Sequence, residues 1–159
     1  MVTEAARAWA AAAAVPDPEI PVLTVADLGI LRRVSLDGGV AVAEVTPTYS
    51  GCPATVAIEL SIEAALRAAG FEARIARVLS PAWTTDWITP EGREKLRACG
   101  IAPPVAGAGK AALFSAPEVA CPRCASADTR RLSEFGSTAC KAQYQCRACA
   151  EPFDYFKCI

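Results

Sequence analysis

Small apolar residues dominate the beginning of the chain, where residues 3–14 are predicted to form a helix. The segment VPDPEIPV ends this helix, because a proline disfavours helical geometry in the residue before it. Two stretches rich in apolar residues, 30–36 and 40–46, then flank Asp37-Gly38-Gly39. Glycine readily adopts the positive φ of a tight turn, so this pattern predicts a β-hairpin.

The pattern then changes to a helix, a strand and a second helix. Residues 54–69 carry apolar side chains at helical spacing and are followed by Gly70, a residue that commonly ends a helix. Apolar and polar residues alternate over residues 71–79, and this pattern predicts a third strand. The next segment is a loop with two tryptophans, after which Thr89 caps a helix that has Pro90 at its first position and runs to about Cys99.

These elements predict an α+β protein with two modules. Residues 1–104 form a small α/β sandwich in the order α-β-β-α-β-α, with helices over one sheet. Residues 105–117, rich in Pro, Gly and Ala, form a linker in which Leu113 and Phe114 could dock on a domain. Residues 118–159 form a zinc ribbon. A length of 159 residues suits one domain of about 100 residues plus a minor module.

The zinc ribbon is predicted from two CxxC pairs separated by 21 residues. Two residues between cysteines allow both sulfur atoms to reach one ion, and four thiolates complete the tetrahedral shell of structural zinc. An all-sulfur tetrahedron also suits iron, so iron remains an alternative. The predicted metal ligands are Cys121, Cys124, Cys146 and Cys149.

Other residues near the two CxxC pairs do not change the predicted set of metal ligands. Cys140 and Cys158 lie outside the pairs and could replace a ligand, but local geometry favours the paired set. Ala125 and Ala150 follow the two pairs, at positions where glycine is common. A bound ion would replace the core that so short a segment cannot build.

The amino-acid composition limits the cellular compartment and the classes of partner that are compatible with the chain. Six of the eight cysteines follow residue 120, which favours a metal site in a reducing cytoplasm over two disulfides in a secreted domain. The net charge of −1 and the lack of a basic run argue against nucleic acid as a partner. No apolar stretch approaches the ~20 residues that cross a bilayer, and Glu4 argues against a signal peptide at residues 8–15.

Cys52 is the second candidate for chemistry. The sequence Gly51-Cys52-Pro53 places it at the beginning of the central helix, where backbone N–H groups and the helix dipole favour a thiolate. Such a thiolate would be a nucleophile or a metal ligand. The alternative, a small buried residue at the helix entry, is equally compatible with position alone.

Carboxylates and hydroxyls precede Cys52 in the chain. Asp17, Glu19 and Asp27, together with Thr46 and Thr48, could share a transient metal with Cys52. Alternatively, the two aspartates cap turns and the glutamate is solvated, which is the favoured interpretation from the residues alone.

Two further features of the sequence bear on function. Trp83 and Trp87 are interpreted as packing residues, although exposed tryptophans would mark a partner surface. The chain has no histidine, no cofactor-binding glycine fingerprint and no paired catalytic carboxylates, so it is not predicted to be an enzyme.

Particular motifs also carry a family resemblance. The segment DPEIPVLTVADLGILRRV, followed by TPTYSGCPA, resembles the domain shared by bacterial Suf-associated accessory proteins and eukaryotic cytosolic iron-sulfur targeting factors. Two further segments make the family resemblance more specific, PAWTTDWITPEGREKLRACGIAPP and FGSTACKAQYQCRACAEPFDYFKCI. From about residue 5 to 159 the chain is similar to the PaaD family, small proteins encoded with the phenylacetyl-CoA epoxidase complex of aerobic phenylacetate catabolism.

This resemblance implies a non-catalytic accessory role in maturation of iron-sulfur clusters or iron. The implied partners are the epoxidase reductase, with a ferredoxin-type cluster and flavin, and the di-iron oxygenase subunits; a homo-oligomer is compatible too. Structural zinc is the expected cofactor, and iron or a cluster the transient cargo. Cys52 matches the family's reactive cysteine, while Glu19, Asp27 and Thr48 fall in its acidic and hydroxyl motifs. The alternative is an electron-transfer or structural subunit with iron in the four-cysteine site.

Overall fold

The computed structural model of the chain describes residues 2–107 and 116–157. Contacts within the chain divide it into two compact units, Met1–Trp83 and Thr84–Ile159. Most of the expected linker, including Leu113 and Phe114, lies outside the described residues. Among the helices that the structure describes, none has both the length and the apolar character needed to cross a membrane.

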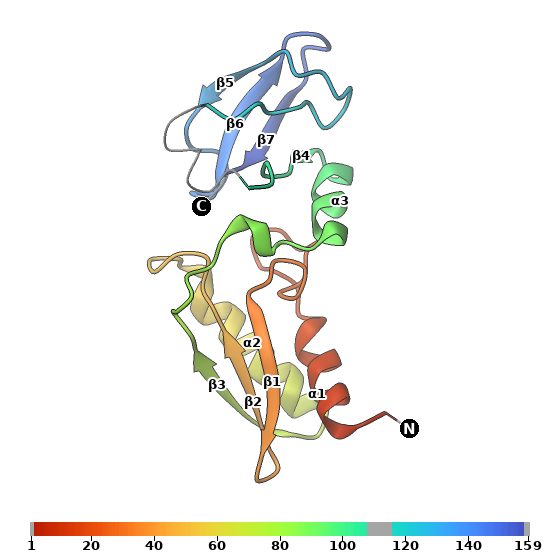
Figure 1. Ribbon diagram of the computed structural model, residues 1–159, viewed down its shortest axis with the longest axis vertical. Coiled ribbons are helices and arrows are strands. Elements are labelled where there is room, and N and C mark those ends of the chain that lie inside the picture. The colour runs from red at the N-terminus through yellow and green to blue at the C-terminus, as the bar shows by residue number, and fades with distance from the viewer. Residues whose placement is uncertain (1, 108–115, 158–159) are drawn as a thin grey trace. The chain divides into compact units, whose positions relative to one another are not determined.

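The first unit is a three-stranded sheet with two helices (Figure 1). The strand order is β1-β2-β3, with β1 antiparallel to β2 and β3 parallel to β2. Its elements follow the order predicted for residues 3–79, and their bounds are α1 (Glu4–Ala13), β1 (Leu31–Asp37), β2 (Val40–Val45), α2 (Ala54–Ala68) and β3 (Glu72–Arg77).

Local signals in the sequence account for the ends of these elements. The Thr3 hydroxyl accepts the backbone N–H of Ala6 and so caps α1. Gly38 and Gly39 have φ of 57° and 91° and join β1 to β2 in the predicted hairpin. Gly70, with φ of 92°, ends α2. Because β2 and β3 are parallel, the chain must cross back between them, and α2 makes that crossover.

The core of the first unit lies between the sheet and the helices. Alternate residues of β2 are fully or almost fully buried, as are the inward positions of α1 and α2. Trp83 is only 4% exposed, and its indole N–H donates to the carbonyl oxygen of Leu28 at 2.8 Å. The packing interpretation of Trp83 is therefore confirmed.

The second unit joins a helix to a four-stranded sheet of order β4-β7-β6-β5. The Thr89 hydroxyl accepts the N–H of Gly92, and Pro90 occupies the first helical position, as predicted. Strand β4 is parallel to β7, while β6 is antiparallel to both β5 and β7. The bounds are η1 (Thr85–Trp87), α3 (Pro90–Ala98), β4 (Ile101–Ala102), β5 (Thr129–Ser133), β6 (Lys141–Cys146) and β7 (Pro152–Phe156).

The division after Trp83 differs from the boundary expected at residue 104. Ile101 and Ala102 of β4 pair with Asp154 and Tyr155 of β7, which places β4 in the ribbon's sheet. A two-residue strand carries no alternation that a sequence pattern could reveal, so this pairing has no signal in the sequence.

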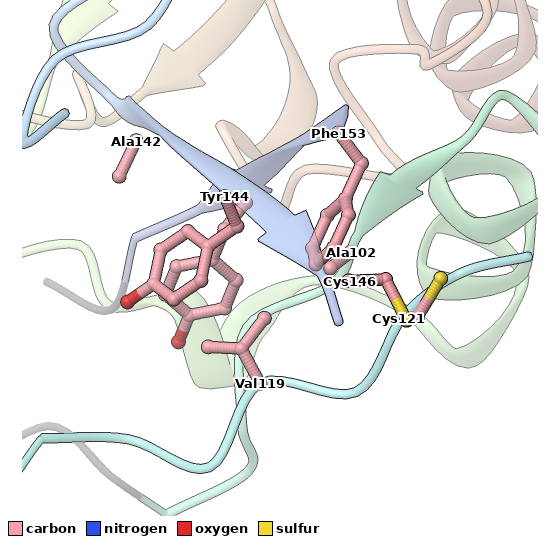
Figure 2. Close-up of a cluster of buried hydrophobic side chains, with 8 residues drawn as sticks. Ala102, Val119, Cys121, Ala142, Tyr144, Cys146 and Phe153 are labelled. Carbon is pink, nitrogen blue, oxygen red and sulfur yellow. The ribbon is translucent and has the colours of Figure 1, made fainter. Parts of the chain in front are cut away.

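The core of the second unit combines ribbon residues with one residue of β4 (Figure 2). The Tyr144 and Phe153 rings stack at 6.0 Å, and the Tyr144 and Tyr155 rings meet edge to face at 5.5 Å. Cys121 and Cys146 lie side by side at one end of the cluster (Figure 2). The buried members are Ala102, Val119, Cys121, Ala142, Tyr144, Cys146, Phe153 and Tyr155.

Candidate functional site

Four cysteine side chains converge at one end of the ribbon. The first CxxC pair precedes β5, whereas Cys146 is the last residue of β6 and Cys149 lies in the turn to β7. The Sγ atoms of Cys124 and Cys146 are 3.5 Å apart, and those of Cys121 and Cys149 are 3.8 Å apart. All four sulfur atoms lie within 4.8 Å of one another. The ligand set predicted from spacing is therefore brought together in space.

The spacing of these sulfur atoms fits a tetrahedral metal ion. A Zn–S distance of about 2.3 Å requires sulfur atoms about 3.8 Å apart at the edges of a tetrahedron. The four thiols are free, not bridged in disulfides. Two of the ligands, Cys121 and Cys146, are buried, while Cys124 and Cys149 are exposed. A resident zinc ion fits this donor set, which iron could also occupy.

Cys140 is buried and lies outside this group of four. Its Sγ is 3.0 Å from the Thr138 hydroxyl. Cys158, the other extra cysteine, lies outside the described residues. The preference for the paired ligands over Cys140 therefore agrees with the geometry.

Each CxxC pair forms a knuckle held by backbone hydrogen bonds. The N–H of Ala125 donates to the Cys121 carbonyl and the N–H of Cys121 donates to the Ser126 carbonyl, both at 2.9 Å. In the second knuckle the N–H of Cys146 donates to the Glu151 carbonyl, also at 2.9 Å. These bonds direct the cysteine side chains toward a common point.

A backbone hydrogen bond within the second CxxC knuckle favours the metal-binding form of Cys146. The backbone N–H of Cys149 points at its sulfur, with an N···S distance of 3.5 Å. This hydrogen bond lowers the pKa of the Cys146 thiol to about 7. Because the thiolate is the form that binds metal, the knuckle favours ligation.

Cys52 lies in the loop between β2 and α2, one residue before the Pro53 cap of α2. Its N–H donates to the Tyr49 carbonyl and its own carbonyl accepts the N–H of Thr55, both at 3.2 Å. The side chain is half-buried and lines a cavity of about 330 Å³. Cys52 is thus not a fully buried helix-entry residue; its surroundings include Pro47, Thr55, Val56, Arg77 and Leu79.

The two aspartates before β1 act as turn caps. The Asp17 carboxylate accepts the N–H groups of Glu19 at 2.9 Å and Ile20 at 2.7 Å. The Asp27 carboxylate accepts the N–H of Thr24 at 2.9 Å, and the Thr24 hydroxyl accepts the N–H of Asp27. These bonds agree with the capping interpretation, in which the carboxylates shape the chain locally.

The proposed partners of Cys52 lie outside the lining of its cavity. Among the described residues, the four ribbon cysteines are the sole group of three or more His, Cys, Asp or Glu whose ligand atoms lie within reach of one ion. Glu19 and Thr48 are half-buried and Asp27 is buried, and none of the three lines the Cys52 cavity. The hydroxyl of Thr46 is buried without a hydrogen-bond partner among the described residues.

Sequence reasoning did not identify Arg77, the charged residue in the lining of the Cys52 cavity. Its guanidinium makes a bidentate pair with Glu59, with Nε···Oε1 and Nη2···Oε2 distances of 2.7 and 2.8 Å. The two residues are 18 positions apart, on β3 and α2. Their pairing depends on how the helix packs on the strand, for which the sequence has no local signal.

Comparisons with known proteins assign separate families to the two parts of the chain. Residues 5–78 match the family model "Iron-sulfur cluster assembly protein", and residues 106–157 match the "PaaD zinc beta ribbon domain". An Escherichia coli protein, named as a putative subunit of 1,2-phenylacetyl-CoA epoxidase, is 55% identical over 95% of this chain and 91% of its own length.

Solved structures also resemble the chain. A Bacillus anthracis crystal structure of a domain of unknown function, DUF59, is 25% identical and has a TM-score of 0.53, over 58% of this chain and 90% of that one. A Mycobacterium tuberculosis protein, described as associated with [Fe-S] complex assembly and repair, is 38% identical over 60% of this chain and 84% of its own, with a TM-score of 0.36. The Bacillus domain supports the α+β fold.

Proposed function

Because this chain belongs to the PaaD family, whose Escherichia coli relative is named as a putative subunit of 1,2-phenylacetyl-CoA epoxidase, we propose that it is an accessory protein of such an epoxidase system. Its role is to deliver iron or an iron-sulfur cluster during maturation of the reductase or oxygenase components. It handles this cargo without catalysing the epoxidation. The place of action is the cytoplasm.

One observation carries the proposal: Cys52 lines an open cavity at the beginning of α2, within the segment that matches the iron-sulfur assembly family. Its thiolate can bind one iron atom of the cargo, next to the positive end of the helix dipole. Because Cys52 supplies one sulfur ligand, the other coordination positions of the iron atom remain available to ligands from a client protein. A client with more ligands can therefore take the cargo away.

The ribbon is proposed to have a separate, structural role. Zinc bound by the four cysteines would cross-link the two knuckles, and it supplies no redox chemistry. The ribbon's own strands then present a fixed surface for docking on the client. Four converging thiolates hold a metal ion far more firmly than Cys52 alone, which suits a permanent ion in the ribbon and a transient one at Cys52.

The remaining predicted residues are proposed to support Cys52 indirectly. Asp27 fixes the turn before β1, Thr48 lies in the loop that leads to Cys52, and Glu19 follows the turn that Asp17 caps.

A second function, electron transfer within the oxygenase, is favoured by one observation: the four-sulfur tetrahedron suits iron as well as zinc. Iron in the ribbon would give the protein a redox centre. Zinc in the ribbon excludes this role, because zinc is redox-silent.

The proposal is tested by the cluster content of the reductase when it is produced with the Cys52→Ser variant. The expected result is a folded variant and a reductase that lacks most of its cluster. Cys99→Ser is the matched control, since Cys99 is an exposed thiol at the end of α3. A normal cluster content with Cys52→Ser contradicts the proposal.

A further inference from the structure

The Cys52 cavity has an electrostatic character that its sequence neighbours do not suggest. Among the residues that line it, Arg77 is the one ionised at every physiological pH, and no carboxylate is among them. A bare divalent iron ion prefers oxygen or nitrogen ligands and is repelled by a guanidinium. The lining therefore offers free Fe²⁺ the Cys52 sulfur and the hydroxyls of Ser50 and Thr55, but no carboxylate.

The Arg77 guanidinium is fixed in place by Glu59. The bidentate pair uses Nε and Nη2, at 2.7 and 2.8 Å, and leaves the donors on Nη1 without a partner among the described residues. The hydrogen bonds and the charge of Glu59 raise the pKa of the guanidinium. Glu59 is not among the residues that line the cavity, so the Nη1 donors are the part of this ion pair that can still bind an anionic ligand.

We propose that Arg77 is a binding residue for an anionic cargo at Cys52, namely an iron-sulfur cluster that carries sulfide and thiolate ligands. This inference rests on the proposed function of Cys52. A cluster core ligated by thiolates has a net negative charge, and its sulfur atoms accept hydrogen bonds from N–H donors. On binding, the Cys52 thiolate replaces one small thiolate on an iron atom, and the released thiolate takes up the proton that the Cys52 thiol gives up, so no electron is transferred.

Two apolar side chains line the same cavity as Arg77 and bear on the strength of this interaction. Val56 and Leu79 line the same cavity and are 59% and 62% exposed in the free protein. A bound cluster would cover part of them and displace water. Charges interact more strongly when water is excluded, so the apolar walls favour an anionic ligand beside Arg77.

The test compares two arginine variants of the full-length, zinc-loaded chain. Arg77→Gln removes the charge from the cavity. Arg74→Gln is the matched control: Arg74 lies on the same strand and pairs with Asp37 at 3.7 Å, yet it does not line the cavity. Each protein is incubated without oxygen with a preformed iron-sulfur cluster ligated by a small thiolate, or with ferrous iron alone. Bound iron and sulfide, and the rate of cluster loss to a chelator, are then measured.

The expected result is that Arg77→Gln loses its cluster about tenfold faster than the wild type, the effect of one charge-assisted hydrogen bond. Binding of ferrous iron alone should be unchanged or tighter in this variant. Arg74→Gln should match the wild type in both measurements. Arg77→Lys keeps the charge and should show a smaller loss, which also provides a test if Arg77→Gln does not fold.

The possible failures can be told apart. Cluster retention that depends on Cys52 but is the same in Arg77→Gln and Arg74→Gln overturns the role of Arg77 alone. A loss in Arg77→Lys as large as in Arg77→Gln overturns charge as its cause. Equal retention by the wild type and Cys52→Ser overturns the proposed function of Cys52, and this inference with it.

Discussion

Ala125 and Ala150 occupy equivalent positions in the two cysteine knuckles and share a left-handed backbone, with φ of 62° and 63°. Each follows a CxxC pair directly, at the position where glycine is common. An L-residue with a Cβ atom is strained in this region, whereas glycine is not. The closed knuckle requires this conformation, whichever residue is present.

Replacement of either alanine by glycine should therefore stabilise the ribbon. Ala125→Gly and Ala150→Gly are each expected to raise the free energy of unfolding of the metal-loaded second unit by about 1 kcal/mol. Denaturant unfolding with a probe in the ribbon measures this change. Ala127→Gly is the control, because Ala127 has no positive φ, and it should not stabilise. Equal effects at all three positions would contradict the strain argument.

Removal of one metal ligand should unfold the ribbon and leave the first unit intact. Cys146→Ser removes a buried ligand and should abolish metal binding, whereas Cys140→Ser, at a buried cysteine outside the ligand group, should retain the metal. Two-dimensional NMR with and without a chelator checks both variants. Unchanged dispersion of the ribbon signals after chelation would contradict a structural metal.

The same variant tests where the second unit begins. Because β4 pairs with β7 and Ala102 shares the buried cluster of Cys121 and Cys146, the Ala102 amide should lose protection from hydrogen exchange in Cys146→Ser. The Ile62 amide in α2 of the first unit should keep its protection. If the Ala102 amide also keeps its protection, residues up to 104 form part of an independent first domain.

Trp83 supports the first unit through a buried hydrogen bond from its indole N–H to the Leu28 carbonyl. Trp83→Phe removes the indole donor and leaves the Leu28 carbonyl without it, which should cost about 1–3 kcal/mol of stability. Thermal or denaturant unfolding of the first unit measures the loss. Trp9→Phe, at a tryptophan that is 39% exposed on α1, is the control and should have little effect.

Much of this architecture could be predicted from local patterns. The hairpin at Gly38-Gly39 and the end of α2 at Gly70 depend on glycine conformations that act within a few residues. The four metal ligands could be identified because CxxC spacing constrains the geometry of each pair. In each case the physical cause lies close to the residues that reveal it.

Other features depend on contacts between distant segments and could not be predicted. The pairing of β4 with β7 joins residues 53 positions apart, Ile101 with Asp154, through the backbone alone. The Arg77–Glu59 pair depends on the packing of α2 on β3.

The two units are proposed to have separate roles. The four ribbon cysteines of the second unit hold a resident metal ion, and Cys52 of the first unit binds transient cargo. The most direct measurement is the zinc and iron content of the wild type and of Cys52→Ser, both purified without added metal. The expected result is about one zinc ion per chain in both proteins and a smaller amount of iron in the wild type alone. Loss of zinc in Cys52→Ser, or the same iron content in both proteins, would contradict this division.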